Sequence, residues 1–212
     1  MEATITYFEA VGRNNTDEVF RIVKKRAAEL NIKTILVSST SGETAAKAVD
    51  ALKGLRIVAV GHSTGYREPN TQEFTEENRR KVESTGGGVL TATHGFGGVN
   101  QAIRARSNNN MLLPNDIIST TLRLFGSGLK VVVEIAITAA DAGLVRTDED
   151  VIAIAGTGRG ADSAYVFRPV NSNSIFDLRI KEILCKPYNP APAPRPATAT
   201  PGQAPAGAPA HH

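Results

Sequence analysis

The sequence predicts an α/β fold: a doubly wound, three-layer αβα sandwich with a mostly parallel sheet. Apolar runs rich in β-branched residues alternate along the chain with segments that have the helical period. Most of these runs are continuously apolar, which is typical of strands covered on both faces by helices. Right-handed crossovers between parallel strands then wind the chain over both faces of the sheet.

The elements follow from the pattern in order. Strands are predicted at residues 5–9, 34–39, 56–61, 88–93, 151–155, 164–168 and 177–184. Helices are predicted from an Asn15-Thr16 cap to about residue 30, and then at 43–52, 75–83, 114–125 and 129–142. The last segment is rich in β-branched residues, but its length and the stop signal at Gly143 favour a helix.

Composition changes sharply near Pro187. From Pro190 onward the residues are almost entirely Pro, Ala, Gly, Thr and Gln, which cannot bury enough apolar surface to offset the entropy of ordering. The chain is therefore divided into one α/β domain at residues 1–187 and a disordered Pro/Ala-rich tail at 188–212. His211 and His212 at the end of this tail are not taken as a metal site.

Composition also excludes several classes of function. The one cysteine, Cys185, excludes an internal disulfide framework and a multi-cysteine zinc site, and it is read as a small core residue in an apolar strand. No secretory signal and no membrane-length apolar run is evident, so a cytoplasmic location without a membrane partner is expected. The net charge is only +3, and the basic clusters are short, so no nucleic-acid partner is expected.

The most informative loop is residues 38–44, S-S-T-S-G-E-T, between a predicted strand and a predicted helix. Small hydroxyl residues donate hydrogen bonds, Gly42 is expected to let a ligand approach the backbone, and a helix start offers unpaired N–H groups. The alternative that needs no ligand is that Glu43 and Thr44 only cap the helix. The pattern predicts a cradle for a phosphate group.

Three more loops follow predicted strands: residues 61–68, 94–100 and 156–162. The domain's two histidines, His62 and His94, fall in two of them, and Arg67 and Arg159 add cations suited to phosphate. Because the carboxyl ends of parallel strands meet at one edge, these loops are expected to form one ligand site. The glycines of residues 156–160 would by themselves indicate no more than turns.

Catalytic patterns are otherwise sparse. Glu134 and Asp141 lie seven residues apart on one apolar helix, so they form either a paired-carboxylate site or, as we favour, structural hydrogen bonds to a neighbouring helix. We assign no serine to a nucleophile elbow, and the sequence contains no P-loop motif. His62 and His94 are the candidate acid/base residues.

The runs T-I-L-V-S-S-T-S-G-E-T-A and R-I-V-A-V-G-H resemble the C-terminal α/β domain of pyruvate kinases. There a similar loop holds a phosphate of an allosteric sugar bisphosphate. The segments H-S-T-G-Y-R-E, V-E-I-A-I-T-A-A-D-A-G-L and V-I-A-I-A-G-T-G-R-G-A-D resemble a group of stand-alone archaeal and bacterial proteins of this fold. The resemblance implies a pyruvate kinase C-terminal domain-like protein. It also implies no pyruvate kinase activity, because 212 residues leave no room for a catalytic (β/α)8 barrel of about 250 residues.

Members of that group resemble binders of flavin mononucleotide (FMN). The resemblance implies that the phosphate is held by Ser39, Thr40, Ser41, Gly42 and Thr44. It implies that the ring and ribityl side are lined by His62, Gly65, Tyr66, Arg67, His94, Gly156, Thr157, Gly158, Arg159 and Gly160. The expected partner is thus a phosphorylated small molecule, with FMN as cofactor and no metal.

Three hypotheses stay open. The first is a stand-alone phosphate-ligand module that binds FMN at the carboxyl edge of the sheet. The second is a small flavin-dependent oxidoreductase with His62 or His94 as acid/base, and the third is a sugar-phosphate or nucleotide sensor. A homo-oligomer is also considered, because residues 107–110 and the apolar helix at 129–142 suggest a partner surface. The helix is equally well explained as a buried layer of the sheet.

Overall fold

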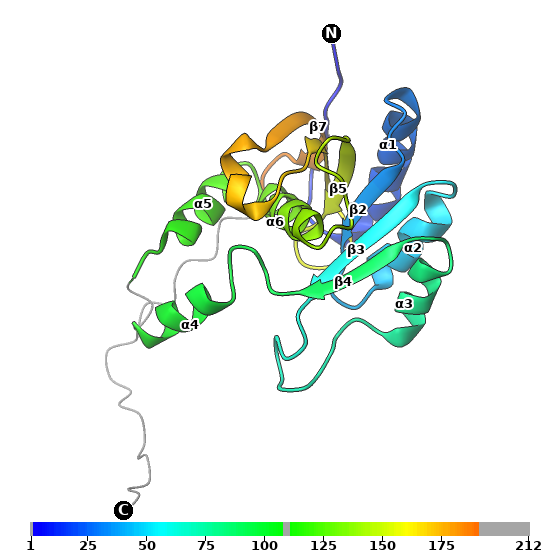
Figure 1. Ribbon diagram of the computed structural model, residues 1–212. Coiled ribbons are helices and arrows are strands. Elements are labelled where there is room, and N and C mark those ends of the chain that lie inside the picture. The colour runs from blue at the N-terminus through cyan, green and yellow to red at the C-terminus, as the bar shows by residue number, and fades with distance from the viewer. Residues whose placement is uncertain (1, 108–110, 191–212) are drawn as a thin grey trace, which may run out of the picture.

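The computed structural model describes residues 2–107 and 111–190, and these form a seven-stranded sheet between two layers of helices (Figure 1). The strands are β1 Thr6–Phe8, β2 Thr34–Ser38, β3 Arg56–His62, β4 Gly88–Ala92, β5 Val151–Ala155, β6 Ser163–Arg168 and β7 Arg179–Pro187. The α-helices are α1 Thr16–Glu29, α2 Glu43–Ala51, α3 Glu76–Glu83, α4 Val99–Arg106, α5 Pro114–Arg123 and α6 Ser127–Asp141. Short 3₁₀ helices lie at η1 Arg13–Asn15 and η2 Ser172–Asp177.

The strand order is β1-β7-β6-β5-β2-β3-β4, and β6 alone runs against its neighbours. From β2 the chain moves outward through β3 to β4, and it then returns to place β5 on the other side of β2. The doubly wound, mostly parallel sheet is therefore confirmed. Its topological switch point lies between β2 and β5, where open α/β sheets commonly bind ligands.

Strand residues alternate between two cores. Ile35, Val37, Ile152 and Ile154 pack on the side of α1 and α2. On the opposite side, Leu36, Val151, Ala153 and Ala155 pack against α6. This helix is buried along nearly its whole length. Figure 1 shows α1, α2 and α3 on one face of the sheet and α6 on the other. The apolar stretch at 129–142 is thus the layer that covers the sheet.

Two local expectations were wrong. Helix α4 was not predicted: it has only eight residues, none of them is buried, and its Val99 and Ile103 are exposed. Asn15 does not cap α1 with its side chain; its Nδ2 donates instead to the Ala10 carbonyl oxygen, 2.8 Å away. By contrast, the Thr75 hydroxyl caps α3 and Pro114 begins α5.

Two segments with sequence-based expectations lie outside the described residues. The tail from 191 to 212 and residues 108–110 are outside the described part of the chain. β7 ends at Pro187, and the Tyr188 N–H still donates to the Phe8 carbonyl oxygen beside β1. Over residues 2–107 and 111–190, no helix combines the length and the apolar character that crossing a membrane requires.

Candidate functional site

Two adjoining cavities, each of about 320 Å³, lie where the loops leave the carboxyl ends of β2, β3, β4 and β5. The first, here called the loop cavity, is lined by Ser38, Ser39, Thr40, Ser41, Glu43, Thr44, Arg67, Glu73, Gly156, Gly158, Arg159 and Gly160. The second, the α6 cavity, is lined mainly by His62, Tyr66, His94, Thr157 and the inner face of α6. The two share Ser38, Thr40, Gly156 and Gly158, so they form one continuous cleft at the switch point.

The β2–α2 turn forms one wall of the loop cavity. The Ala45 N–H donates to the Ser39 hydroxyl and the Glu43 N–H to the Ser41 hydroxyl, each across 3.4 Å. Within the described residues, the N–H groups of Thr40, Ser41 and Thr44 donate to no protein atom. Unpaired donors at the positive end of a helix favour an anion.

Gly42 has a different role from the one expected. Its φ is +88°, and a Cβ at this position would lie 2.5 Å from Asn78 Cβ and 2.6 Å from Phe74 Cε1. Gly42 does not line either cavity. The glycine is therefore required by the packing of the turn against Phe74 and α3, and the expectation that it opens the backbone to a ligand was wrong.

The β5–β6 loop forms the opposite wall and is fixed by a buried carboxylate. Asp162 is fully buried, and its Oδ2 accepts from the N–H groups of Thr157 and Gly12, each at 2.9 Å. Its Oδ1 accepts from the Ser163 hydroxyl at 2.8 Å. Because β6 turns back beside β5, this loop joins a hairpin, which explains why no helix follows its glycines.

Close packing accounts for two of the three glycines in that loop. A Cβ on Gly156 would lie 2.4 Å from the Gly160 carbonyl oxygen, and one on Gly160 would lie 2.6 Å from Thr16 Oγ1. Gly158 has open space around it but a φ of +84°. In the part of the chain that the structure describes, the N–H groups of Gly158, Arg159 and Gly160 have no protein acceptor.

Two arginines reach the loop cavity. Arg67 Nε lies 3.0 Å from Glu73 Oε1, and Arg159 makes no ion pair with any described residue. Glu43 also lines this cavity, but it pairs with Lys47 at 3.2 Å on the outside of α2. The arginines and the unpaired N–H groups make the loop cavity suited to the oxygens of a phosphate group.

Three rings gather in the α6 cavity. The centroid of His62 lies 4.1 Å from that of Tyr66 and 4.8 Å from that of His94, and the Tyr66 and His94 centroids are 5.0 Å apart. They come from the end of β3, the loop after it and the residues that follow β4. The expectation that the two histidines share one edge of the sheet is confirmed.

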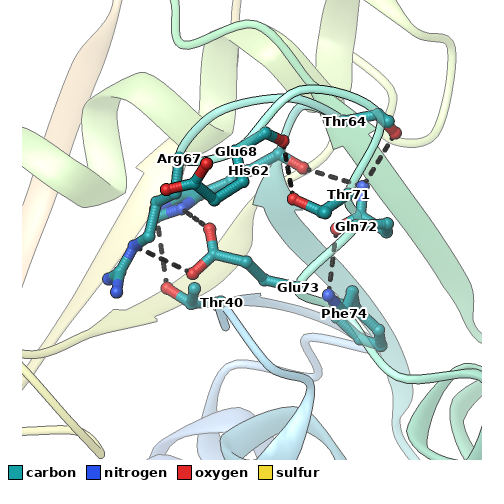
Figure 2. Close-up of polar contacts among 9 residues, drawn as sticks. All are labelled: Thr40, His62, Thr64, Arg67, Glu68, Thr71, Gln72, Glu73 and Phe74. Atoms are coloured by element: carbon teal, nitrogen blue, oxygen red, sulfur yellow. Dashed lines mark hydrogen bonds and ion pairs between the residues drawn. The ribbon is translucent and has the colours of Figure 1, made fainter.

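His62 has a polar side chain beside each of its ring nitrogens. Its Nδ1 lies 2.7 Å from Glu73 Oε2, and its Nε2 lies 3.5 Å from Thr40 Oγ1 (Figure 2). Figure 2 also shows that Glu73 lies between His62 and Arg67, so that one carboxylate holds both side chains. Gln72 fixes the loop that carries Glu73, because its Nε2 donates to the His62 carbonyl oxygen and its Oε1 accepts from the Phe74 N–H.

Helix α6 places an ion pair on the wall facing these rings. Lys130 Nζ contacts Glu134 Oε2, and Glu134 Oε1 accepts from the Phe96 N–H at 3.0 Å. Both side chains are nearly buried, and burial lowers the pKa of Lys130 although Glu134 opposes the shift. Burial is also the main cause that lowers the pKa of His94; Glu134 opposes it, while His62 and Lys130 add to it.

The paired-carboxylate alternative for Glu134 and Asp141 was wrong. Glu134 faces the cleft, whereas Asp141 is exposed and accepts from Asn171 Nδ2 and the Ser172 N–H beside η2. The favoured prediction of structural hydrogen bonds to a neighbouring helix holds for Asp141, whereas Glu134 bonds Lys130 of its own helix and Phe96 in a loop. Cys185 is buried in β7, and burial raises the pKa of its thiol to about 12, as expected for a core cysteine.

Of the site residues predicted from the sequence, all but Gly42 and Gly65 line the cleft. Gly65 lies in the turn after β3, where its N–H donates to the Thr71 carbonyl oxygen. The polar residues that sequence reasoning missed are Glu73, Thr93, Arg123, Ser127, Lys130 and Thr138. The signal for Lys130 was available, since it interrupts an apolar helix four residues before Glu134. Across the described ranges, no three His, Cys, Asp or Glu side chains are grouped as metal ligands.

The fold and the cleft define a doubly wound α/β domain with a polar ligand-sized pocket at its switch point. The family model described as "Pyruvate kinase, alpha/beta domain" matches residues 17–167, which run from α1 to β6. The chain therefore belongs to the pyruvate kinase α/β domain family. β1 and β7, which pair in parallel at one edge of the sheet, lie wholly outside the matched range.

Solved structures similar to this chain are also pyruvate kinases. A pyruvate kinase from Cryptosporidium parvum is 16% identical, with a TM-score of 0.36 over 73% of this chain and 23% of that one. A second Cryptosporidium parvum pyruvate kinase structure is 14% identical, with a TM-score of 0.34 over 73% and 22%. A third, in complex with ADP, is 16% identical, with a TM-score of 0.33 over 71% and 22%. The chain thus spans less than a quarter of the length of these enzymes.

Proposed function

We propose that the chain binds flavin mononucleotide across the cleft, with the phosphate in the loop cavity and the ring system in the α6 cavity. The observation that carries the proposal is the division of one continuous cleft into an anion-binding part and a part lined by rings. Such a division matches a ligand with a phosphate at one end and a flat conjugated ring at the other.

The phosphate end is supported by donors from two loops. Thr40, Ser41 and Thr44 offer N–H groups on one side, and residues 158–160 offer N–H groups on the other. Arg159 would supply a positive charge, because it forms no ion pair with any described residue. Donors converging from both walls would hold a phosphate more firmly than one helix terminus alone.

The ring end is supported by Tyr66, His62 and His94, whose rings offer a stacking surface. Opposite them, Lys130 and Glu134 offer a donor and an acceptor for the polar edge of a ring system. The residues present therefore fit the group. When bound, FMN supplies hydride and one-electron chemistry.

Titration of the purified full chain with FMN, riboflavin and fructose 1,6-bisphosphate tests the proposal, with flavin fluorescence and calorimetry as readouts. FMN is expected to bind and riboflavin to bind at least ~10-fold more weakly, because riboflavin lacks the phosphate. Arg159→Ala should weaken FMN and leave riboflavin unchanged, with Arg146→Ala as a distant matched control. Equal affinity for FMN and riboflavin, or no flavin binding, would refute the proposal; binding of the sugar bisphosphate alone would favour a sensor.

A flavin-dependent oxidoreductase is the second candidate, because His62 and His94 both line the cavity assigned to the ring. Single-turnover reduction of the FMN-loaded protein by NAD(P)H tests this function. Reduction that is slowed by His62→Ala or His94→Ala would favour an enzyme. Loading without reduction would favour a binding module.

A further inference from the structure

Three side chains form a connected series at the point where the two cavities meet. Glu73 Oε2 lies 2.7 Å from His62 Nδ1, and His62 Nε2 lies 3.5 Å from Thr40 Oγ1. The side chains of His62 and Glu73 are 20% and 21% exposed, so the series is sheltered but reachable from the cleft. A carboxylate, an imidazole and a hydroxyl in this order are the parts that activate a hydroxyl nucleophile.

The carboxylate decides which nitrogen of His62 can accept a proton. Glu73 is an acceptor, so the neutral imidazole carries its hydrogen on Nδ1 and leaves the Nε2 lone pair toward Thr40. The second carboxylate oxygen is held by Arg67 Nε at 3.0 Å. The Glu73 carboxylate is therefore fixed at both oxygens, and the imidazole is oriented before any ligand arrives.

Thr40 is placed where a nucleophile is useful. It lies two residues after the end of β2, in the strand-to-helix turn, and it lines both cavities. Its own N–H and that of Ser41 donate to no described protein atom, so two backbone donors are available beside the hydroxyl. Backbone N–H groups of this kind stabilise the oxyanion that forms when a hydroxyl attacks a carbonyl.

We propose that Thr40 is the nucleophile of an acyl-transfer site that hydrolyses small carboxylic esters, with His62 as general base and Glu73 as the residue that positions it. Thr40 Oγ1 attacks the ester carbonyl carbon, and its proton passes to His62 Nε2. The bond to the alkoxy group breaks, and His62 returns the proton to the leaving alcohol. Water then attacks acyl-Thr40 with the same base, which releases the acid and restores the hydroxyl. The net reaction consumes one water molecule for each ester hydrolysed and needs no other reactant.

The 3.5 Å separation is long for a hydrogen bond, but such contacts are often loose in proteins without a ligand and shorten in the substrate complex. The cavities suggest which esters fit. The α6 cavity has apolar walls from Val60, Val131 and Ile135, which suit a short acyl chain, whereas the loop cavity suits an anionic alcohol portion.

Hydrolysis of p-nitrophenyl acetate by the purified full chain tests the proposal, together with mass spectrometry of the protein quenched in acid during turnover. We expect a burst of nitrophenolate and an added acetyl group on Thr40. Thr40→Val should remove the burst and reduce the rate to that of the buffer, while Thr40→Ser retains both. Thr147→Val, at an exposed site near the opposite edge of the sheet, is the matched control and should behave as the unchanged protein.

Glu73→Gln distinguishes positioning from mere stability. The amide would no longer fix the tautomer of His62, so we expect kcat to fall at least ~100-fold with KM nearly unchanged, and Glu73→Asp to recover part of kcat. Thermal unfolding of each variant shows whether it is folded. An unchanged kcat in folded Glu73→Gln would overturn the role of Glu73.

Two other outcomes would overturn the whole proposal. One is absence of hydrolysis above the buffer rate in the unchanged chain. The other is hydrolysis that persists in Thr40→Val but is lost in His62→Ala, which would mean that His62 activates water directly. The acyl-transfer proposal does not rest on flavin binding: riboflavin and FMN affinities are measured separately, and either proposal can fail while the other stands.

Discussion

The Phe74 ring occupies the space that a side chain on Gly42 would need: a Cβ at Gly42 would lie 2.6 Å from Phe74 Cε1 and 2.9 Å from Cζ. Phe74 is itself buried in the core beneath α2. The turn that forms one wall of the loop cavity is thus fixed by a contact with a residue 32 positions later in the chain.

Gly42→Ala should destabilise the protein for two reasons, its positive φ and this overlap. We expect a loss of about 3 kcal/mol in the free energy of unfolding, measured by urea denaturation. Gly143→Ala is the matched control, because Gly143 has a φ of +70° and nothing within 4 Å of its ideal Cβ. The control should lose about 1 kcal/mol. Equal losses in the two variants would show that the overlap with Phe74 is relieved without cost.

Asp162→Asn should weaken both the fold and the cleft. The amide cannot replace the carboxylate at all three of its donors, Gly12 N, Thr157 N and Ser163 Oγ, because its nitrogen is itself a donor. We expect a loss of about 2–3 kcal/mol in the free energy of unfolding. Asp177→Asn, at an exposed position, is the control and should change it by less than about 0.5 kcal/mol. A loss in Asp162→Asn no larger than in the control would contradict the anchoring role of Asp162.

Tyr165→Phe should stabilise the protein or leave it unchanged. Tyr165 is fully buried, and its hydroxyl oxygen has no hydrogen-bond partner among the described residues. Burial accordingly raises the pKa of this hydroxyl above its usual range. Removal of an unsatisfied buried group is expected to change the free energy of unfolding by about 0 to +1 kcal/mol. A clear loss of stability would mean that the hydroxyl has a partner, such as a buried water molecule.

Acid should destabilise the fold partly through His94. Because the pKa of His94 is lowered in the folded protein, the unfolded chain binds more protons below the ordinary histidine pKa of about 6.5. Stability from this residue is therefore present above that pH and is lost as the pH falls through it. His94→Gln should show a smaller loss of unfolding free energy than the unchanged protein between pH 7.5 and 5.5. An identical pH dependence would show that His94 is not a neutral buried group.

Much of the cleft followed from the sequence because strand ends in a parallel sheet share one edge. That rule predicted that His62 and His94 lie close together and that the Ser/Thr turn lies beside the 156–162 loop. Gly42, Glu73 and Lys130 did not follow from it, because their roles depend on which distant segments pack against them. Helix α4 was missed for another reason: eight residues give too short an apolar pattern to separate a helix from the glycine-rich loop before it.

The hydrogen bond from the Gly12 N–H to Asp162 joins residues 150 positions apart, next to loops from the middle of the chain. Closing a loop of this length costs chain entropy, which the contact must offset. The cleft is therefore completed only when the two ends of the domain have come together. A ligand that occupies it would report that both segments are in place, and a shortened chain that lacks either loop would give no such signal.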